Sequence, residues 1–298
     1  MTCECFALVK FRAATLADIG RANAILEEFS GQGFVLTLRQ LFYQFVARDL
    51  MPNTVADYKR LGRTVADARR AGLIDWERIE DRTRELATFP SWESPADILV
   101  SAAHSYREDV WGGQNFRAEV WVEKAALIGV IEPACRRWRI PSMAARGYPS
   151  CSELYAAGKR MAEHIRAGLS PVVFYLGDHD PSGLDMTRNL RAELATYTRA
   201  PIEVVRLGLN LDQVRDLGLP PNSAKESDLR YADYVRETGC DESWELDALS
   251  PAFIDDLIDS AIRERIDDPE WRAALLIEEE NRDCLERLAA KFDEGEAA

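Results

Sequence analysis

Three carboxylates that follow apolar segments are the residues in this chain best suited to chemistry. Asp178 and Asp180 come directly after VVFYLG, and Glu123 comes directly after VWV. Carboxylate oxygens suit Mg²⁺, which keeps several of its waters and binds phosphates. A lone Asp-x-Asp pair is equally typical of a turn in which Asp side chains accept backbone N–H bonds. The three carboxylates together, each at a strand end, favour a metal site.

The segments around these carboxylates predict strands that alternate with helices. Strands are expected over 117–123, 140–147, 171–180 and 202–209, with helices over 124–138, 150–168 and 182–197 between and after them. This order is typical of a parallel sheet with helices on both faces, in which ligands bind beyond the carboxyl ends of the strands. If the first and third strands are neighbours, the three carboxylates converge. Strand alternation points His179 away from Asp178 and Asp180, so we exclude it from the site.

The N-terminal third has a different pattern. It predicts helices over 15–29, 38–50 and 55–72, a short strand or helix entry over 34–37 with Thr37 as N-cap, and strand and turn material over 73–86. Three helices followed by a β segment are the order of a winged-helix domain, a common DNA-binding module. We therefore expect an α/β protein with a winged-helix domain over 1–95, a linker over 96–116 and an α/β domain over 117–298. Its last part, from about 251 to 298, is expected to be acidic helix.

The net charge of −14 first suggests that nucleic acid is an unsuitable partner. However, residues 201–298 hold 11 basic and 26 acidic side chains, a net charge of −15, so the first two thirds are nearly neutral. Basic patches there remain able to face phosphates. No stretch reaches the roughly 18 consecutive apolar residues of a membrane span, and the N-terminus lacks the features of a signal peptide. Six cysteines without a CxxC pair fit a reduced, cytoplasmic protein.

The carboxylate motifs resemble those of the Toprim domain, and more closely those of the A subunit of DNA topoisomerase VI and its meiotic relative, the double-strand-break transesterase. The matching segments are VEKAA at 122–126, RGYPS at 146–150 and DHDPSG at 178–183. Ser150 and Ser182 depart from the family, which usually has Asp and Tyr there. The resemblance implies a Rossmann-like Toprim domain over 117–298, in which Glu123, Asp178 and Asp180 hold Mg²⁺.

The same family has a nucleophilic tyrosine in its winged-helix domain, and RQLFY at 39–43 resembles that segment. The resemblance implies that Tyr43 attacks DNA and that Arg39 assists it. Helical spacing independently puts Arg39 one turn before Tyr43, on the flank of an apolar face. We therefore expect a partly exposed Tyr43 beside a guanidinium, which would lower its pKa or steady a phosphate. The alternative is a structural tyrosine at the edge of the core.

Basic residues follow the tyrosine on the third predicted helix and suit phosphate contacts, although such clusters are also common on solvated faces. The candidate DNA-binding residues are Lys59, Arg60, Arg63, Arg69, Arg70, Lys124 and Arg146.

These observations predict a Mg²⁺-dependent, DNA-cleaving transesterase of the topoisomerase VI A type, located in the cytoplasm with the nucleoid. Cutting both strands of double-stranded DNA needs two tyrosines, which predicts a homodimer. The chain has no Walker A pattern, so a separate ATPase partner resembling the family's B subunit is expected for a topoisomerase. Two alternatives remain open: a Toprim nuclease that hydrolyses DNA with a metal-activated water, and a non-catalytic DNA-binding protein with a degenerate site.

Overall fold

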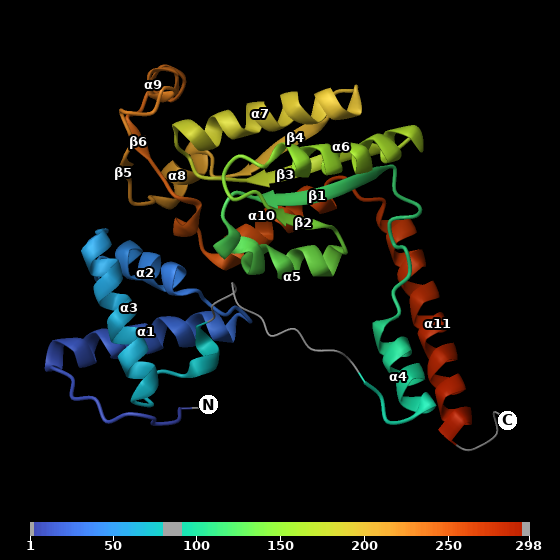
Figure 1. The fold of residues 1–298 in the computed structure, drawn as a ribbon, viewed down its shortest axis with the longest axis horizontal. Coiled ribbons are helices and arrows are strands. Elements are labelled where there is room, and N and C mark those ends of the chain that lie inside the picture. The colour runs from blue at the N-terminus through green and yellow to red at the C-terminus, as the bar shows by residue number, and fades with distance from the viewer. Residues whose placement is uncertain (1–2, 80–90, 294–298) are drawn as a thin grey trace.

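The computed structural model describes residues 3–79 and 91–293 (Figure 1). The N-terminal unit comprises α1 (Ala13–Gly31), α2 (Leu38–Ala47), α3 (Val55–Arg70) and the short 3₁₀ helix η1 (Trp76–Arg78). Thr37 caps α2 as predicted, because its hydroxyl accepts a bond from the Gln40 N–H at 3.3 Å. Ile79 forms an isolated parallel bridge with Leu36. The remainder of the predicted β segment, 80–86, lies outside the described residues.

The second unit is built on a parallel sheet, as predicted. Its strands are β1 (Phe116–Val122), β2 (Ser142–Ala144), β3 (Ser170–Leu176) and β4 (Glu203–Gly208), in the order β2-β1-β3-β4. β1 and β3 are neighbours, with Val122 level with Leu176. The residues that follow these two strands therefore emerge side by side.

Helices cover both faces of the sheet (Figure 1). α5 (Ile128–Trp138) and α10 (Pro251–Arg263) pack on the face that carries Val120 and Phe174, whereas α6 (Cys151–Arg166) and α7 (Pro181–Thr198) pack on the face that carries Trp121 and Tyr175. Alternate residues of each strand are thus buried in two separate cores, which explains why the strands are apolar throughout. This double burial fixes the register of the strand ends.

Short elements follow β4 and return the chain to the sheet. They are α8 (Leu211–Leu217), β5 (Asn222–Ser223), α9 (Tyr231–Thr238), β6 (Glu242–Ser243) and η3 (Leu246–Ala248), and η2 (Ala125–Leu127) precedes α5. Within the described ranges, no helix is long and apolar enough to cross a membrane.

The segment predicted as a linker contains a packed helix. α4 (Pro95–Ser105) lies against α11 (Asp268–Asp293), and the two form an arm that projects from the sheet (Figure 1). The helix starts there because Ser94 accepts a bond from the Asp97 N–H at 3.1 Å and Pro95 occupies the first turn. The expected linker over 96–116 therefore begins within a helix whose packing partner lies far along the chain.

Candidate active site at the carboxyl edge of the sheet

Glu123 and Asp178 meet where β1 and β3 end. The Glu123 carboxylate accepts the Asp178 backbone N–H at 2.9 Å, and its own N–H donates to Leu176 O at 2.8 Å. The Tyr175 hydroxyl lies 3.5 Å from the same Glu123 oxygen. Two of the three predicted carboxylates are thus held together by the adjacency of their strands.

Asp178 is buried and bound on both oxygens. One oxygen accepts the Leu246 N–H at 2.7 Å, and the other lies 2.8 Å from the Lys124 ammonium. Burial raises the pKa of the Asp178 carboxyl, and the nearby Lys124 opposes that shift. Lys124 therefore acts as the local counter-charge of this carboxylate.

Asp180, the third predicted ligand, caps α7. Its carboxylate accepts the Gly183 N–H at 2.6 Å and the Ser182 hydroxyl at 2.9 Å. Ser182, where the family usually has tyrosine, thus contacts Asp180 directly. Ser150, the other departure, caps α6 in a capping box with Glu153. Both serines have local structural roles next to the motifs in which they occur.

The loop that carries the aspartates is held by a buried guanidinium that sequence reasoning missed. Arg206 on β4 donates to the carbonyls of Gly177 at 2.9 Å, Asp178 at 2.6 Å and Gly183 at 2.8 Å. A Cβ at Gly177 would lie 2.7 Å from the Tyr175 hydroxyl and 2.8 Å from a Glu123 oxygen. Glycine is therefore required for the close approach of this loop to Glu123.

Two further carboxylates, Glu245 and Asp247, complete the cluster, and sequence reasoning missed both. The Lys124 ammonium lies 3.0 Å from Glu245 and 2.7 Å from Asp247. The Asp247 side chain is fully buried. The available signal was the alternation in WELDAL, where Trp244 and Leu246 are buried in the core and the acidic residues point to the opposite side.

The predicted nucleophile and its arginine reach this cluster from the N-terminal unit of the same chain. The Arg39 guanidinium pairs with Glu245 and lies 3.3 Å from Asp247. Its Cζ is 5.7 Å from the centre of the Tyr43 ring, which confirms the predicted adjacency of the two side chains on α2. Tyr43 lines the same cavity as Glu245, which raises the pKa of the phenol. Arg39, Glu245, Lys124 and Asp178 thus form one continuous network of ion pairs, with Tyr43 beside Arg39.

The expected exposure of Tyr43 is wrong. The residue is only 5% exposed, because the segment with Glu245 and Asp247 packs over α2. Burial and Glu245 raise the pKa of the Tyr43 phenol above its ordinary value, whereas Arg39 and Lys124 act in the opposite direction without reversing the shift. Arg39 thus lowers the pKa of Tyr43 as expected, but burial and Glu245 outweigh it.

The carboxylates of the cluster differ in their affinity for protons. Burial, followed by repulsion from Asp178, raises the pKa of Glu123 to about 7. Burial opposes ionisation of Glu245 as well, but Lys124 and Arg39 outweigh it and lower the pKa of Glu245 to about 2. At neutral pH, Glu245 is therefore a fixed anion, and Glu123 exchanges its proton readily.

The donor set fits Mg²⁺ in its chemistry. Within 3–79 and 91–293, no three of these side chains are arranged as a ready metal site. The donors are nevertheless all carboxylate oxygens, and the Lys124 ammonium lies among three of them as a cation. One oxygen of Asp247 is buried without a hydrogen-bond partner among the described residues. Glu123 and Asp178 would hold a magnesium ion at this edge, with Asp180 adjacent.

His179 lies apart from the cluster, as predicted. Its ring nitrogen Nδ1 is 3.1 Å from Leu209 O, and the ring packs against Tyr234 and Trp244. It is buried in this contact and fixes the loop from the far side.

The predicted DNA-binding residues fall into two groups. The first group is exposed and comprises Lys59, Arg60, Arg63 and Arg70 on α3 together with Arg146. Within it, Arg60 is paired with Asp18 and Asp57. Arg146 lies near Glu123, because the N–H of the next residue, Gly147, donates to the Glu123 carbonyl. Lys124 is engaged with carboxylates and Arg69 with backbone carbonyls, so neither presents its charge to solvent as expected. Burial lowers the pKa of Arg69. Its Cζ lies 4.7 Å from the centre of the Trp76 ring, on which the guanidinium stacks.

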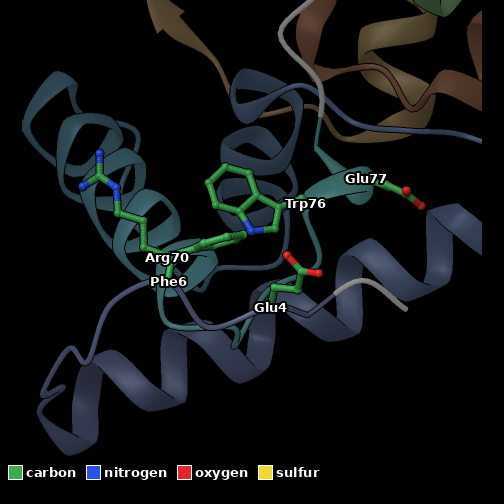
Figure 2. Close-up of a pocket in the computed structure, with 5 residues that line it drawn as sticks. All are labelled: Glu4, Phe6, Arg70, Trp76 and Glu77. Atoms are coloured by element: carbon green, nitrogen blue, oxygen red, sulfur yellow. The ribbon is translucent and has the colours of Figure 1, made fainter.

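Two hollows lie near predicted functional residues, one beside Arg70 and one beside Tyr43. A shallow pocket of about 530 Å³ beside Arg70 has the rings of Phe6 and Trp76 as its apolar walls, with centroids 6.0 Å apart (Figure 2). A second cavity of about 200 Å³ adjoins Tyr43, Arg39 and Glu245 at the contact between the two units. Asn53 and Asn222 bridge that contact with a hydrogen bond of 2.8 Å.

Comparisons of the chain with protein-family models, with curated proteins and with solved structures found no match.

Proposed function

We propose that this protein cleaves double-stranded DNA by tyrosine transesterification, with Tyr43 as the nucleophile and Mg²⁺ held by Glu123, Asp178 and Asp180. The observation that carries the proposal is the network of ion pairs that runs from Arg39, beside Tyr43, through Glu245 and Lys124 to Asp178. It joins a phenol, two cations and a carboxylate edge from segments far apart in the sequence. A purely structural Tyr43 would not need this set of charged partners.

The contacts support a division of roles. The Tyr43 oxygen would attack phosphorus while its phenol proton passes to a water molecule. The P–O bond to the leaving deoxyribose oxygen breaks as the Tyr43–phosphate bond forms, and that oxygen takes a proton from water. Arg39 would steady the phosphate charge. Bound Mg²⁺ would supply further stabilisation of that charge.

The domain assignments belong to the same proposal. A winged-helix domain is supported by three helices, the Leu36–Ile79 bridge and the exposed cations of α3. A Toprim domain is supported by the parallel sheet and by carboxylates at the ends of β1 and β3. A homodimer, a separate ATPase partner and a location with the nucleoid would follow from double-strand cutting of the topoisomerase VI type.

The test is a cleavage assay on supercoiled plasmid with Mg²⁺, stopped with detergent and divided into portions with and without protease. We expect nicked or linear DNA that enters the gel fully only after protease treatment, because the ends carry covalently bound protein. Tyr43→Phe should abolish the adduct, whereas Tyr58→Phe, which alters a neighbouring tyrosine of the same cavity, should keep it. Cleavage by Tyr43→Phe at the wild-type rate would refute the nucleophile.

A second candidate is a metal-dependent nuclease that uses water, and the burial of Tyr43 favours it. A buried phenol whose pKa is raised by burial and by a nearby carboxylate is a poor nucleophile until the segment that covers it moves. This candidate predicts protein-free ends, loss of cleavage in Asp178→Asn and normal cleavage in Tyr43→Phe. If Asp178→Asn leaves the protein's DNA-related activity intact, the site is degenerate and the protein only binds DNA.

A further inference from the structure

The arm formed by α4 and α11 carries an apolar stripe that the fold leaves uncovered. Ala273, Ile277, Cys284 and Leu288 are all exposed, with exposed fractions of 49% for Ile277 and 43% for Leu288. At 3.6 residues per turn they fall within about 60° of one another on the helix. Their side of α11 lies about 100° from the buried residues Trp271, Glu278 and Ala289. The stripe is therefore separate from the contact with α4.

The spacing of the stripe is that of a helix-pairing seam. Ile277, Cys284 and Leu288 are separated by seven and four residues, a spacing that keeps their side chains facing a second helix. Asn281 lies at the edge of this seam, where its amide donates to the Tyr106 hydroxyl at 3.0 Å. α11 has 26 residues and is about 39 Å long, and among the described elements its main packing partner is α4. A long helix with an apolar seam on its outer side is suited to pair with another helix.

Two charges beside the stripe identify the second helix. Glu280 and Arg287 are exposed on the same edge of the seam, and neither has an ion-pair partner within the part of the chain that the structure describes. An antiparallel pair of identical helices brings the same edges together. Glu280 would then meet the partner subunit's Arg287, and Arg287 would meet the partner subunit's Glu280. A parallel pair would instead set both charges against the edge with Asn281 and Leu285.

We infer that α11 pairs with α11 of a second copy of this chain, antiparallel, with Ile277 packed against Leu288 of the partner subunit. The charge complementarity argues for a second copy, because one sequence supplies both members of each ion pair. The stripe then becomes the core of a two-fold symmetric interface. The inference rests on the homodimer of the proposed function and assigns its interface. A DNA-cleaving dimer that Leu288→Asp leaves intact would overturn the inference and leave the proposed function standing.

The base of the arm keeps its orientation through a buried ion pair. Arg139 pairs with Glu278, which also accepts the Glu108 backbone N–H at 2.7 Å. Glu278 is 3% exposed, directly follows Ile277 and also pairs with Arg282 one turn later. The seam is thus presented in a fixed direction, which lowers the entropic cost of pairing.

The test is sedimentation equilibrium of the full chain over the micromolar range. We expect a dimer for the wild type, and dimer dissociation constants raised roughly tenfold by Glu280→Arg and by Arg287→Glu, each of which sets like charges against each other. The double variant E280R/R287E should recover the wild-type constant. Leu288→Asp should yield a monomer, whereas Leu229→Asp, at a residue that is 99% exposed elsewhere, should remain dimeric.

Circular dichroism of each variant separates lost pairing from lost folding, and a short bis-maleimide should link two copies through Cys284 only when the dimer forms. A monomeric wild type would leave the stripe to a different protein and overturn the inference. A dimer unaffected by Leu288→Asp, or a double variant that fails to recover, would place the dimer interface elsewhere and overturn it as well.

Discussion

The carboxyl edge of the sheet and the outer face of α3 both carry charges that the sequence indicates as functional, but they hold them differently. At the sheet edge, Lys124 is partly buried among three carboxylates, and Asp247 is fully buried. On α3, Lys59 and Arg63 project into solvent. Buried charges are costly to unpair, whereas exposed pairs contribute little to stability. The charges at the edge are therefore fixed by their pairing, whereas those of α3 remain available to solvent.

The largest difference in stability between the two regions is expected on replacing Lys124. Replacing it with alanine leaves three carboxylates without their shared cation, and we expect the free energy of unfolding to fall by about 3–5 kcal/mol. Urea unfolding followed by circular dichroism measures the change. Arg63→Ala on α3 is the matched control and should change stability by less than about 0.5 kcal/mol. Equal effects at the two positions would show that burial does not distinguish the regions.

Replacing Gly177 tests how tightly the sheet edge is packed, in comparison with an open glycine elsewhere. Gly177→Ala puts a methyl group 2.8 Å from a Glu123 oxygen, and we expect destabilisation of about 1–3 kcal/mol. Gly20→Ala, in the helix α1 with nothing within 4 Å of the added carbon, should stabilise by about 0.5–1 kcal/mol. Thermal unfolding of both variants checks the opposite signs. A neutral Gly177→Ala would mean that the loop has room to move away from Glu123.

The pH dependence of stability tests the sheet edge alone. The pKa of Glu123 is raised from 4.5 to about 7, so the folded state binds more protons than the unfolded state between these values. The contribution of Glu123 to stability is therefore fully present below pH 4.5 and is lost as pH rises toward 7. In metal-free buffer, Glu123→Gln should flatten this decline. An unchanged pH profile would contradict the shifted pKa.

The smallest effect on stability is expected on α3, where the readout is DNA affinity. Lys59→Gln and Arg63→Gln should leave stability within about 0.5 kcal/mol. If each contacts a phosphate, each should weaken DNA binding across sequences and reduce the slope of log K against log salt by roughly 1. Fluorescence anisotropy at several salt concentrations measures both quantities. Glu77→Gln near η1 serves as the control, and a slope insensitive to α3 would move the DNA elsewhere.

The parts of the site that sequence reasoning predicted depend on local order. Glu123 and Asp178 could be predicted because strand ends on neighbouring parallel strands must lie together. Arg39 and Tyr43 could be paired because they are four residues apart on one helix. For Arg39 and Tyr43 the spacing along one helix was enough, whereas Glu123 and Asp178 also required β1 and β3 to be neighbours.

What could not be predicted depends on contacts between distant segments. Glu245 and Asp247 enter the site because their short segment packs on α2, about two hundred residues earlier in the chain. The same contact buries Tyr43, which helical spacing alone would leave partly exposed. The packing of α4 on α11 could not be predicted either, because the two helices are likewise remote in the sequence. The hydrophobic periodicity of a short stretch of sequence does not indicate which distant segment that stretch packs against.

Arg206 gives the loop with the aspartates a property that the rest of the site lacks. Its guanidinium binds the carbonyls of Gly177, Asp178 and Gly183, and although burial lowers its pKa, arginine stays protonated in proteins. The loop's shape is therefore insensitive to acidity in the range where Glu123 titrates. Lysine, with one compact ammonium, would not span the three carbonyls. The protein thus separates a backbone that is constant with pH from a carboxyl group that responds to it.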